Sequence, residues 1–192
     1  MKGKTRKELD RELKRDEIMR AALKLFLEKG IKDTRLEEIA ESVYLTKPTI
    51  YYYFKSKEHI VDALAARGWQ YLYEVARRYF DPENPRDSFF KIVREQMNLY
   101  RTRYELLKFL FVSSGHITES DGEGNLKEWA SYKKELLNIY GDLLEQLVGE
   151  ERVPVVQKAI GGLIHGILNL GRAPEERDFE NAIEFLKKLV DS

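Results

Sequence analysis

The chain has 192 residues, enough for one domain with a full core or for two small ones. It has no cysteine, which excludes disulfides, thiol catalysis and cysteine-ligated zinc. Lys and Arg balance Asp and Glu at 33 each, but residues 1–60 hold 15 cations and 11 anions, a net charge of +4, so the remainder carries −4. This asymmetry favours a DNA- or membrane-facing N-terminal part, although ordinary charge scatter would also produce it.

The N-terminal segment MKGKTRKELDRELKR lacks the apolar core of a signal peptide, and polar residues interrupt the longest apolar run, 153–170. We therefore expect a cytoplasmic protein that makes no membrane contact. The basic residues Lys2, Lys4, Arg6 and Lys7 could follow a DNA backbone or a minor groove. A disordered, solvated tail is the simpler expectation for them.

Apolar residues recur at three- and four-residue spacing along nearly the whole chain, which predicts an all-α fold of about nine helices. Thr34 to Glu37 fits a capping box for the second helix, and Thr46 is placed to cap the third. Ser56 is placed to cap the fourth. In chain order the expected helices cover residues 8 or 15–28, 35–43, 47–54, 57–80, 88–102, 104–114, 126–148, 154–170 and 178–190.

The second and third helices are short, and only two residues separate them. This arrangement predicts a helix-turn-helix over about residues 35–54, with the third helix in the DNA major groove. At about 100° per residue, Ile50 and Phe54 share the face that packs on the other helices. Pro48 and Tyr52 lie opposite, and Tyr53 is intermediate.

The outer face of the third helix carries residue types that suit nucleic acid. Thr and Tyr hydroxyls bond phosphate oxygens, Pro and Thr can touch a thymine methyl, and Lys neutralises phosphate. A helix N-terminus beside Lys57 also favours phosphate. The alternative is that the aromatic rings simply belong to the core, which we accept for Phe54 but not for Tyr52, because no apolar neighbour shares its face.

The segment LFLEKGIKDTRLEEIAESVYLTKPTIYYYFKSKEHI resembles the N-terminal domain of TetR-type transcriptional regulators. Tyr44 departs from the family pattern, which often has Gly in the turn between the second and third helices. Because a positive φ is costly for Tyr, either the turn has another geometry or it tolerates the strain. The residues that carry the resemblance are Ala22, Leu25, Phe26, Gly30, Thr34, Ile39, Ala40, Thr49, Ile50, Tyr51, Tyr53, Phe54 and Lys57.

The resemblance implies that Tyr51 and Lys57 touch phosphates and that positions 47, 48, 49 and 52 reach the groove. It also implies a DNA-binding domain over residues 1–60 and an effector-binding and dimerisation domain over residues 61–192. The residues expected to contact DNA are Thr34, Arg35, Lys47, Pro48, Thr49, Tyr51, Tyr52 and Lys57.

The last two predicted helices carry features of a subunit interface. Three glycines in the helix over 154–170 imply the close approach of another backbone, and the helix over 178–190 has two apolar rows. We expect both to form a four-helix bundle with their symmetry mates, which is where the resembling family dimerises. The expected interface residues are Gly162, Gly166, Phe179, Ile183, Phe185 and Leu186.

The acidic part of the chain is rich in large aromatic residues. An apolar cavity with a few hydroxyl and indole donors would suit an organic effector, whereas a filled core is the alternative. The resemblance favours a cavity, and the polar segment 113–125 is either its gate or a plain surface loop. The expected effector-binding residues are Trp69, Tyr73, Tyr100, Tyr104, Phe111, Trp129, Tyr132, His165 and Asn169.

Taken together, these patterns predict a ligand-responsive repressor that binds a palindromic operator as a homodimer and is released by a small, largely apolar effector. The alternative is a constitutive or architectural DNA-binding protein without an effector. We expect no enzyme and no cofactor, because nucleophile elbows, phosphate loops and metal pairs are missing. The three histidines are far apart in sequence, which argues against a metal site.

Overall fold

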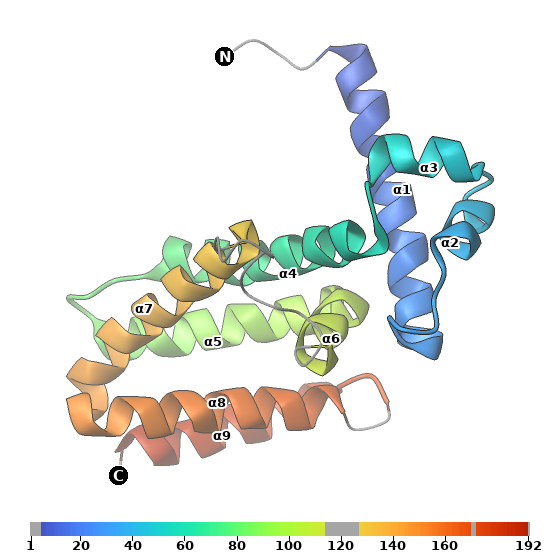
Figure 1. Ribbon diagram of the computed structural model, residues 1–192. Helices are drawn as coiled ribbons and strands as arrows, with labels where there is room; N and C mark the ends of the chain where they lie inside the picture. The colour runs from blue at the N-terminus through green and yellow to red at the C-terminus, as the bar shows by residue number, and fades with distance from the viewer. Residues whose placement is uncertain (1–4, 114–126, 170–171, 192) are drawn as a thin grey trace. The chain divides into compact units, whose positions relative to one another are not determined.

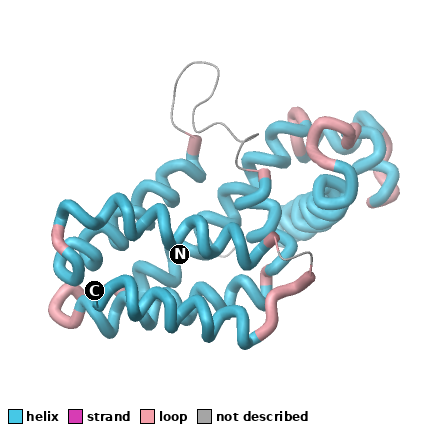
Figure 2. The backbone as a smooth tube through the Cα atoms, turned by 90° about the horizontal axis from the view of Figure 1, so that it is seen from below, coloured by secondary structure: helices cyan, strands magenta, loops and turns pink. Residues whose placement is uncertain are grey.

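The computed structural model describes residues 5–113, 127–169 and 172–191, which form nine α-helices and one 3₁₀ turn and contain no strand. Figure 2 shows these helices joined by loops, so the all-α prediction is confirmed. None of the described helices combines the length and apolar character needed to cross a membrane. The predicted loop over 113–125 lies, apart from Ser113, outside the described residues.

The chain divides into two compact units, Met1–Ala65 and Ala66–Ser192, called here the N-terminal unit and the C-terminal unit. The division falls five residues after the boundary expected from the sequence. It lies within α4 (Lys57–Tyr79), so one helix contributes to both units. Ser56 caps α4 as predicted, since the His59 N–H donates to its hydroxyl at 3.2 Å.

The N-terminal unit contains α1 (Arg6–Lys29), α2 (Leu36–Ser42), α3 (Lys47–Tyr53) and the start of α4 (Figure 1). A capping box begins α1: the Thr5 N–H donates to the Glu8 carboxylate at 2.7 Å, and the Glu8 N–H donates to the Thr5 hydroxyl at 3.3 Å. Arg6 and Lys7 are therefore helical, which corrects the expected disordered tail at these two positions. Lys2 and Lys4 lie outside the described residues.

The capping box predicted for α2 is shifted by one residue. The Glu38 carboxylate, rather than that of Glu37, accepts a hydrogen bond from the backbone N–H at the start of the helix, that of Arg35, at 2.7 Å. Thr34 is buried, and its hydroxyl donates to the Gly30 carbonyl at 2.8 Å. Because this hydroxyl is hydrogen-bonded to the end of α1, it does not cap α2.

The C-terminal unit begins within α4 and contains α5 (Pro85–Thr102), α6 (Tyr104–Val112), α7 (Glu128–Val148), η2 (Glu150–Arg152), α8 (Val153–Leu168) and α9 (Glu176–Asp191). α5 begins three residues earlier than predicted, at Pro85, which needs no N–H partner there. The buried Ser88 hydroxyl donates to the Tyr79 carbonyl at 2.8 Å and accepts from the Asp81 N–H at 3.0 Å. It thereby fixes the turn between α4 and α5.

A buried polar network joins three helices inside the C-terminal unit. The Gln96 side-chain amide of α5 donates to the Leu72 carbonyl of α4 at 2.9 Å, and the Tyr140 hydroxyl of α7 donates to Gln96 Oε1 at 2.8 Å. Burial raises the pKa of Tyr140, which keeps its hydroxyl protonated as a donor. The apolar part of this core includes Leu72, Phe89, Ile92, Leu107, Phe109, Leu143, Leu144 and Val156.

Candidate functional site

The aromatic residues at the end of α3 point in different directions, as helical periodicity predicts. Ile50 and Phe54 are fully buried, whereas Tyr51 is 46% exposed and Tyr52 60% exposed. Tyr53 is half-buried, at the boundary. The buried pair anchors α3 on the N-terminal unit, so this short helix presents two tyrosine rings to solvent.

The turn between α2 and α3 keeps a left-handed residue despite the absence of glycine. Tyr44 has a φ of 56° and is 97% exposed. Its N–H donates to the Glu41 carbonyl at 3.1 Å, and the Leu45 N–H donates to the Ala40 carbonyl at 2.8 Å. This is the Schellman pattern of helix termination, in which glycine is the usual left-handed residue. Of the two possibilities raised by the sequence, the structure shows the strained one.

The exposed Tyr52 ring has neighbours from two helices. The Tyr53 ring meets it edge-on with 5.0 Å between centroids, and the Arg11 guanidinium carbon of α1 lies 5.3 Å from its centroid. One turn further along α1, the Arg15 guanidinium lies 4.1 Å from the Phe54 ring centroid and donates to the Tyr53 carbonyl. Sequence reasoning missed both arginines, although their four-residue spacing places them on one helix face.

Lys47 and the other predicted groove residues of α3 are exposed. Lys47 pairs with Glu37 of α2, and their hydrogen bond lowers the pKa of Glu37 and raises that of Lys47. The Thr46 and Thr49 hydroxyl oxygens lie 2.8 Å apart, so Thr46 bonds another side chain rather than capping the backbone. Pro48 is exposed, and so is Arg35 at the start of α2.

Two of the residues expected to contact DNA, Thr34 and Lys57, make hydrogen bonds within the N-terminal unit. Thr34 is only 1% exposed. The Lys57 ammonium donates to the carbonyls of Ile31 at 2.6 Å and Thr34 at 2.9 Å, and it lies 3.3 Å from that of Lys32. Both side chains hold the segment between α1 and α2, because its carbonyl groups lack helical partners. In this structure both side chains therefore stabilise the approach to α2.

The predicted effector residues form several separate contacts within the C-terminal unit. The Phe111 ring lies 5.9 Å from the Trp69 ring and 6.1 Å from the Tyr100 ring, centroid to centroid. The rings of Tyr73 and Tyr132 form a second pair at 5.9 Å. Of these five residues only Tyr100 is buried, whereas Trp69, Tyr73, Phe111 and Tyr132 are half-buried.

The polar groups of the remaining predicted effector residues differ in burial and in hydrogen bonding. Trp129 is 4% exposed, and its indole N–H has no hydrogen-bond partner within the described residues. The Tyr104 hydroxyl donates to the Arg172 carbonyl at 3.3 Å. His165 and Asn169 are exposed and bond each other at 3.0 Å, so they do not point into the core.

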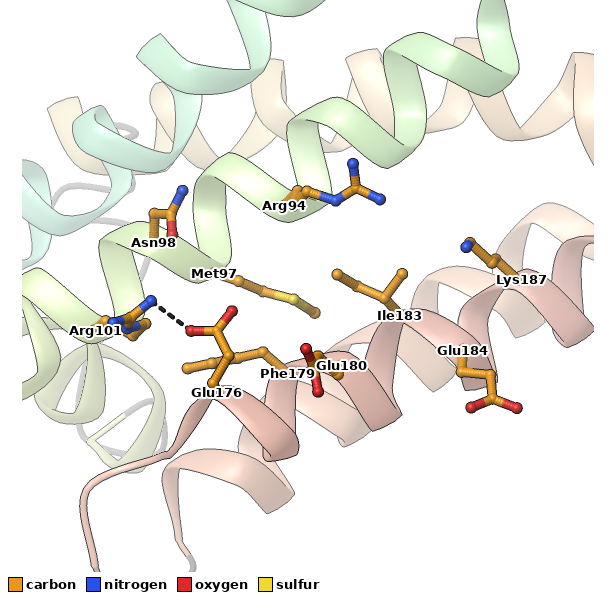
Figure 3. Close-up of a pocket in the computed structure, with 10 residues that line it drawn as sticks. All are labelled: Arg94, Met97, Asn98, Arg101, Glu176, Phe179, Glu180, Ile183, Glu184 and Lys187. Carbon is orange, nitrogen blue, oxygen red and sulfur yellow. Dashed lines mark hydrogen bonds and ion pairs between the residues drawn. The ribbon is translucent and has the colours of Figure 1, made fainter.

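Two small hollows lie between α5, α8 and α9, with α7 lining the larger one. Their volumes are about 20 and 10 Å³, and Tyr100 is the predicted effector residue that lines both. Each is close to the space that one water molecule occupies. A larger groove of about 400 Å³ lies on the surface between α5 and α9 (Figure 3), where Met97, Phe179 and Ile183 are flanked by charged side chains. Arg101 and Glu176 pair across it at 2.5 Å.

The predicted dimer residues fall into three groups. Phe179 and Leu186 are 3% and 2% exposed, so they belong to the core of their own unit rather than to a free face. The buried row of α9 follows the spacing 179, 182, 186 and 190, and the half-buried Ile183 lines the surface groove together with Phe179. By contrast, Phe185 is 49% exposed, and a Cβ added at Gly162 or Gly166 would meet nothing within 4 Å.

Residues 18–64 match the model of the tetR family of bacterial regulatory proteins. IcaR, the biofilm operon icaADBC HTH-type negative transcriptional regulator of Staphylococcus epidermidis, is 26% identical over 114 residues, which are 59% of this chain and 62% of that protein. The HTH-type transcriptional repressor KstR2 of Mycolicibacterium smegmatis is 37% identical over 49 residues, 26% of this chain and 24% of that protein. The chain thus spans less than two thirds of the length of these curated relatives.

Solved structures share the fold over nearly the whole chain. The TetR family transcriptional regulator PfmR from Thermus thermophilus has a TM-score of 0.73 at 18% identity, covering 90% of this chain and 96% of that one. AibR, solved in complex with isovaleryl coenzyme A and operator DNA, has a TM-score of 0.72 at 19% identity, covering 89% and 96%. The matched family segment includes the helix-turn-helix, so over residues 18–64 the chain is similar to the tetR family of bacterial regulatory proteins.

Proposed function

We propose that the protein is a DNA-binding transcriptional regulator, a repressor that uses α3 to read an operator. The observation that carries this proposal is the division of α3, with Ile50 and Phe54 fully buried while Tyr51 and Tyr52 remain exposed. A helix anchored in this way can enter a major groove without disturbing the core. Pro48 and Thr49 then lie on the groove side, and Lys47 exchanges its carboxylate partner for a phosphate.

Homodimerisation through α8 and α9 fits the surface that these two neighbouring helices leave open. Gly162 and Gly166 offer room for the close approach of a second backbone, and Phe185 and Val155 are 49% and 66% exposed. A two-fold dimer presents two copies of α3, which matches a palindromic operator. Sedimentation should give twice the chain mass at micromolar concentration, and Phe185→Glu should shift the protein toward the monomer.

Release by a small, largely apolar organic effector is the regulatory part of the proposal. The fold neighbour AibR was solved with both isovaleryl coenzyme A and operator DNA. In this chain, the buried Trp129 indole N–H is a donor that an effector could satisfy. Effector and operator binding would be linked by a coupling free energy, because each would favour a different state of the protein.

The test begins with selection of bound sequences from a random duplex library. The affinity for the selected operator is then measured with and without compounds that raise the melting temperature. Tyr52→Ala should weaken operator binding while leaving the melting temperature nearly unchanged. Failure to select any sequence would contradict the proposed regulator, and equal operator affinity with every stabilising compound would contradict effector release.

A constitutive DNA-binding protein is the second candidate, and the small size of the two hollows between α5, α8 and α9, among the described residues, favours it. At about 20 and 10 Å³, they hold no organic molecule unless the helices move. This candidate predicts tight operator binding that no small molecule changes, with no extra electron density between α5 and α8 in crystals of the purified protein.

A further inference from the structure

Four cations follow one face of the N-terminal half of α1, outside the helix-turn-helix. Lys7, Arg11, Lys14 and Arg15 lie at positions i, i+4, i+7 and i+8, which confines them to roughly 100° of the helix circumference. They are called here the α1 stripe. Because the Thr5 capping box starts the helix at Arg6, this stripe belongs to an ordered element.

The inner end of the stripe is held against the base of α3. Arg15 donates to the Tyr53 carbonyl and stacks on the Phe54 ring, and Lys14 pairs with Glu17 at 2.5 Å. The outer two members, Lys7 and Arg11, are exposed. Their charges therefore remain accessible to a partner in solution.

Arg11 joins the α1 stripe to the exposed face of α3. Its guanidinium carbon lies 5.3 Å from the centroid of the Tyr52 ring, which is itself 60% exposed. Figure 1 shows the N-terminal part of α1 continuing beyond α3, and Lys7 lies one further turn along it, roughly 6 Å by helical rise. A guanidinium that stacks on an aromatic ring can still bind a phosphate through its edge.

We propose that Lys7 and Arg11 bind DNA phosphates next to the groove that α3 enters, so that α1 extends the interface beyond the helix-turn-helix. This inference rests on the proposed DNA-binding function. Phosphate contacts release counterions, and each contributes about 0.9 to the slope of log affinity against log salt concentration. The α1 stripe would add affinity without sequence preference.

The experiment measures binding of a labelled 30-base-pair duplex of mixed sequence by fluorescence anisotropy between 50 and 200 mM NaCl. Lys7→Ala with Arg11→Ala should reduce the magnitude of the salt slope by about 1.8, so the wild type should lose about twelve-fold more affinity than the variant over this range. The matched control is Arg20→Ala with Lys24→Ala, which removes two exposed cations from the opposite side of the same helix.

Arg11→Lys separates charge from stacking, because it should keep the salt slope while losing the planar contact with Tyr52. Equal slopes for the wild type and the Lys7/Arg11 variant would overturn the proposal, as would an equal loss of slope in the control. A wild-type protein that binds neither this duplex nor any sequence selected from the random library would instead refute the proposed function itself. Unchanged melting temperatures would show that the variants are folded.

Discussion

The two units differ in how far apart in the sequence the residues of their main contacts lie. In the N-terminal unit, the consecutive positions 50–54 at the end of α3 supply both the anchor, Ile50 and Phe54, and the exposed face, Tyr51 and Tyr52. In the C-terminal unit, the contacts that matter join residues far apart, as when Gln96 links Leu72 to Tyr140. For a local motif, the sequence can thus predict which way individual side chains point. For a helical bundle, it predicts only where the helices lie in the chain.

The largest test of this comparison substitutes two aromatic positions of the N-terminal unit that lie two residues apart. Phe54→Ala should cost about 3–5 kcal/mol of unfolding free energy, because it removes a fully buried ring and leaves a cavity. Tyr52→Ala should change stability by less than about 0.5 kcal/mol, as expected for a largely exposed position. Urea denaturation of both variants checks the result. Similar losses for the two would mean that α3 is rotated from the orientation described.

The matching test in the C-terminal unit targets its long-range polar network. Tyr140→Phe should cost about 1–2 kcal/mol, because it leaves the buried Gln96 carbonyl oxygen without its donor. Tyr44→Phe is the control, since the Tyr44 side chain is 97% exposed and should contribute almost nothing. A cost for Tyr140→Phe no larger than that of the control would show that the network adds little to this core.

A smaller test concerns backbone strain in the turn between α2 and α3. Tyr44→Gly should stabilise the protein by about 0.5–1 kcal/mol, because glycine adopts the positive φ without a Cβ clash and little packing is lost. The entropy of glycine in the unfolded chain offsets part of this gain. Thermal denaturation checks the sign, with Tyr44→Ala as a variant that keeps the strained Cβ. A destabilised glycine variant would mean that the exposed ring makes a contact of its own.

Helix positions followed from periodicity in both units, with boundaries shifted by a few residues where caps were misassigned. The directions of Ile50, Tyr52 and Phe54 were predictable because one helical wheel decides them. The hydrogen bonds of Lys57 were not predictable, since its carbonyl partners in 31–34 become close only when the loop folds back. For the same reason the sequence could not distinguish Phe179 in the core from Phe185 on the surface, as both lie on apolar rows.

The smallest expected effect is a pH dependence at the start of α9 in the C-terminal unit. Hydrogen bonds from Arg172 and from the Glu175 N–H lower the pKa of Asp178 to about 2. A carboxyl group whose pKa falls on folding stabilises the protein fully above its unfolded value, near 3.9, and loses this contribution as the pH drops through about 2. Asp178→Asn should therefore flatten the decline of the melting temperature between pH 4 and pH 2, relative to the wild type. Arg172→Gln should flatten it in part, because the backbone hydrogen bond remains. If the wild type and Asp178→Asn decline in parallel, the pair between Arg172 and Asp178 does not persist in solution.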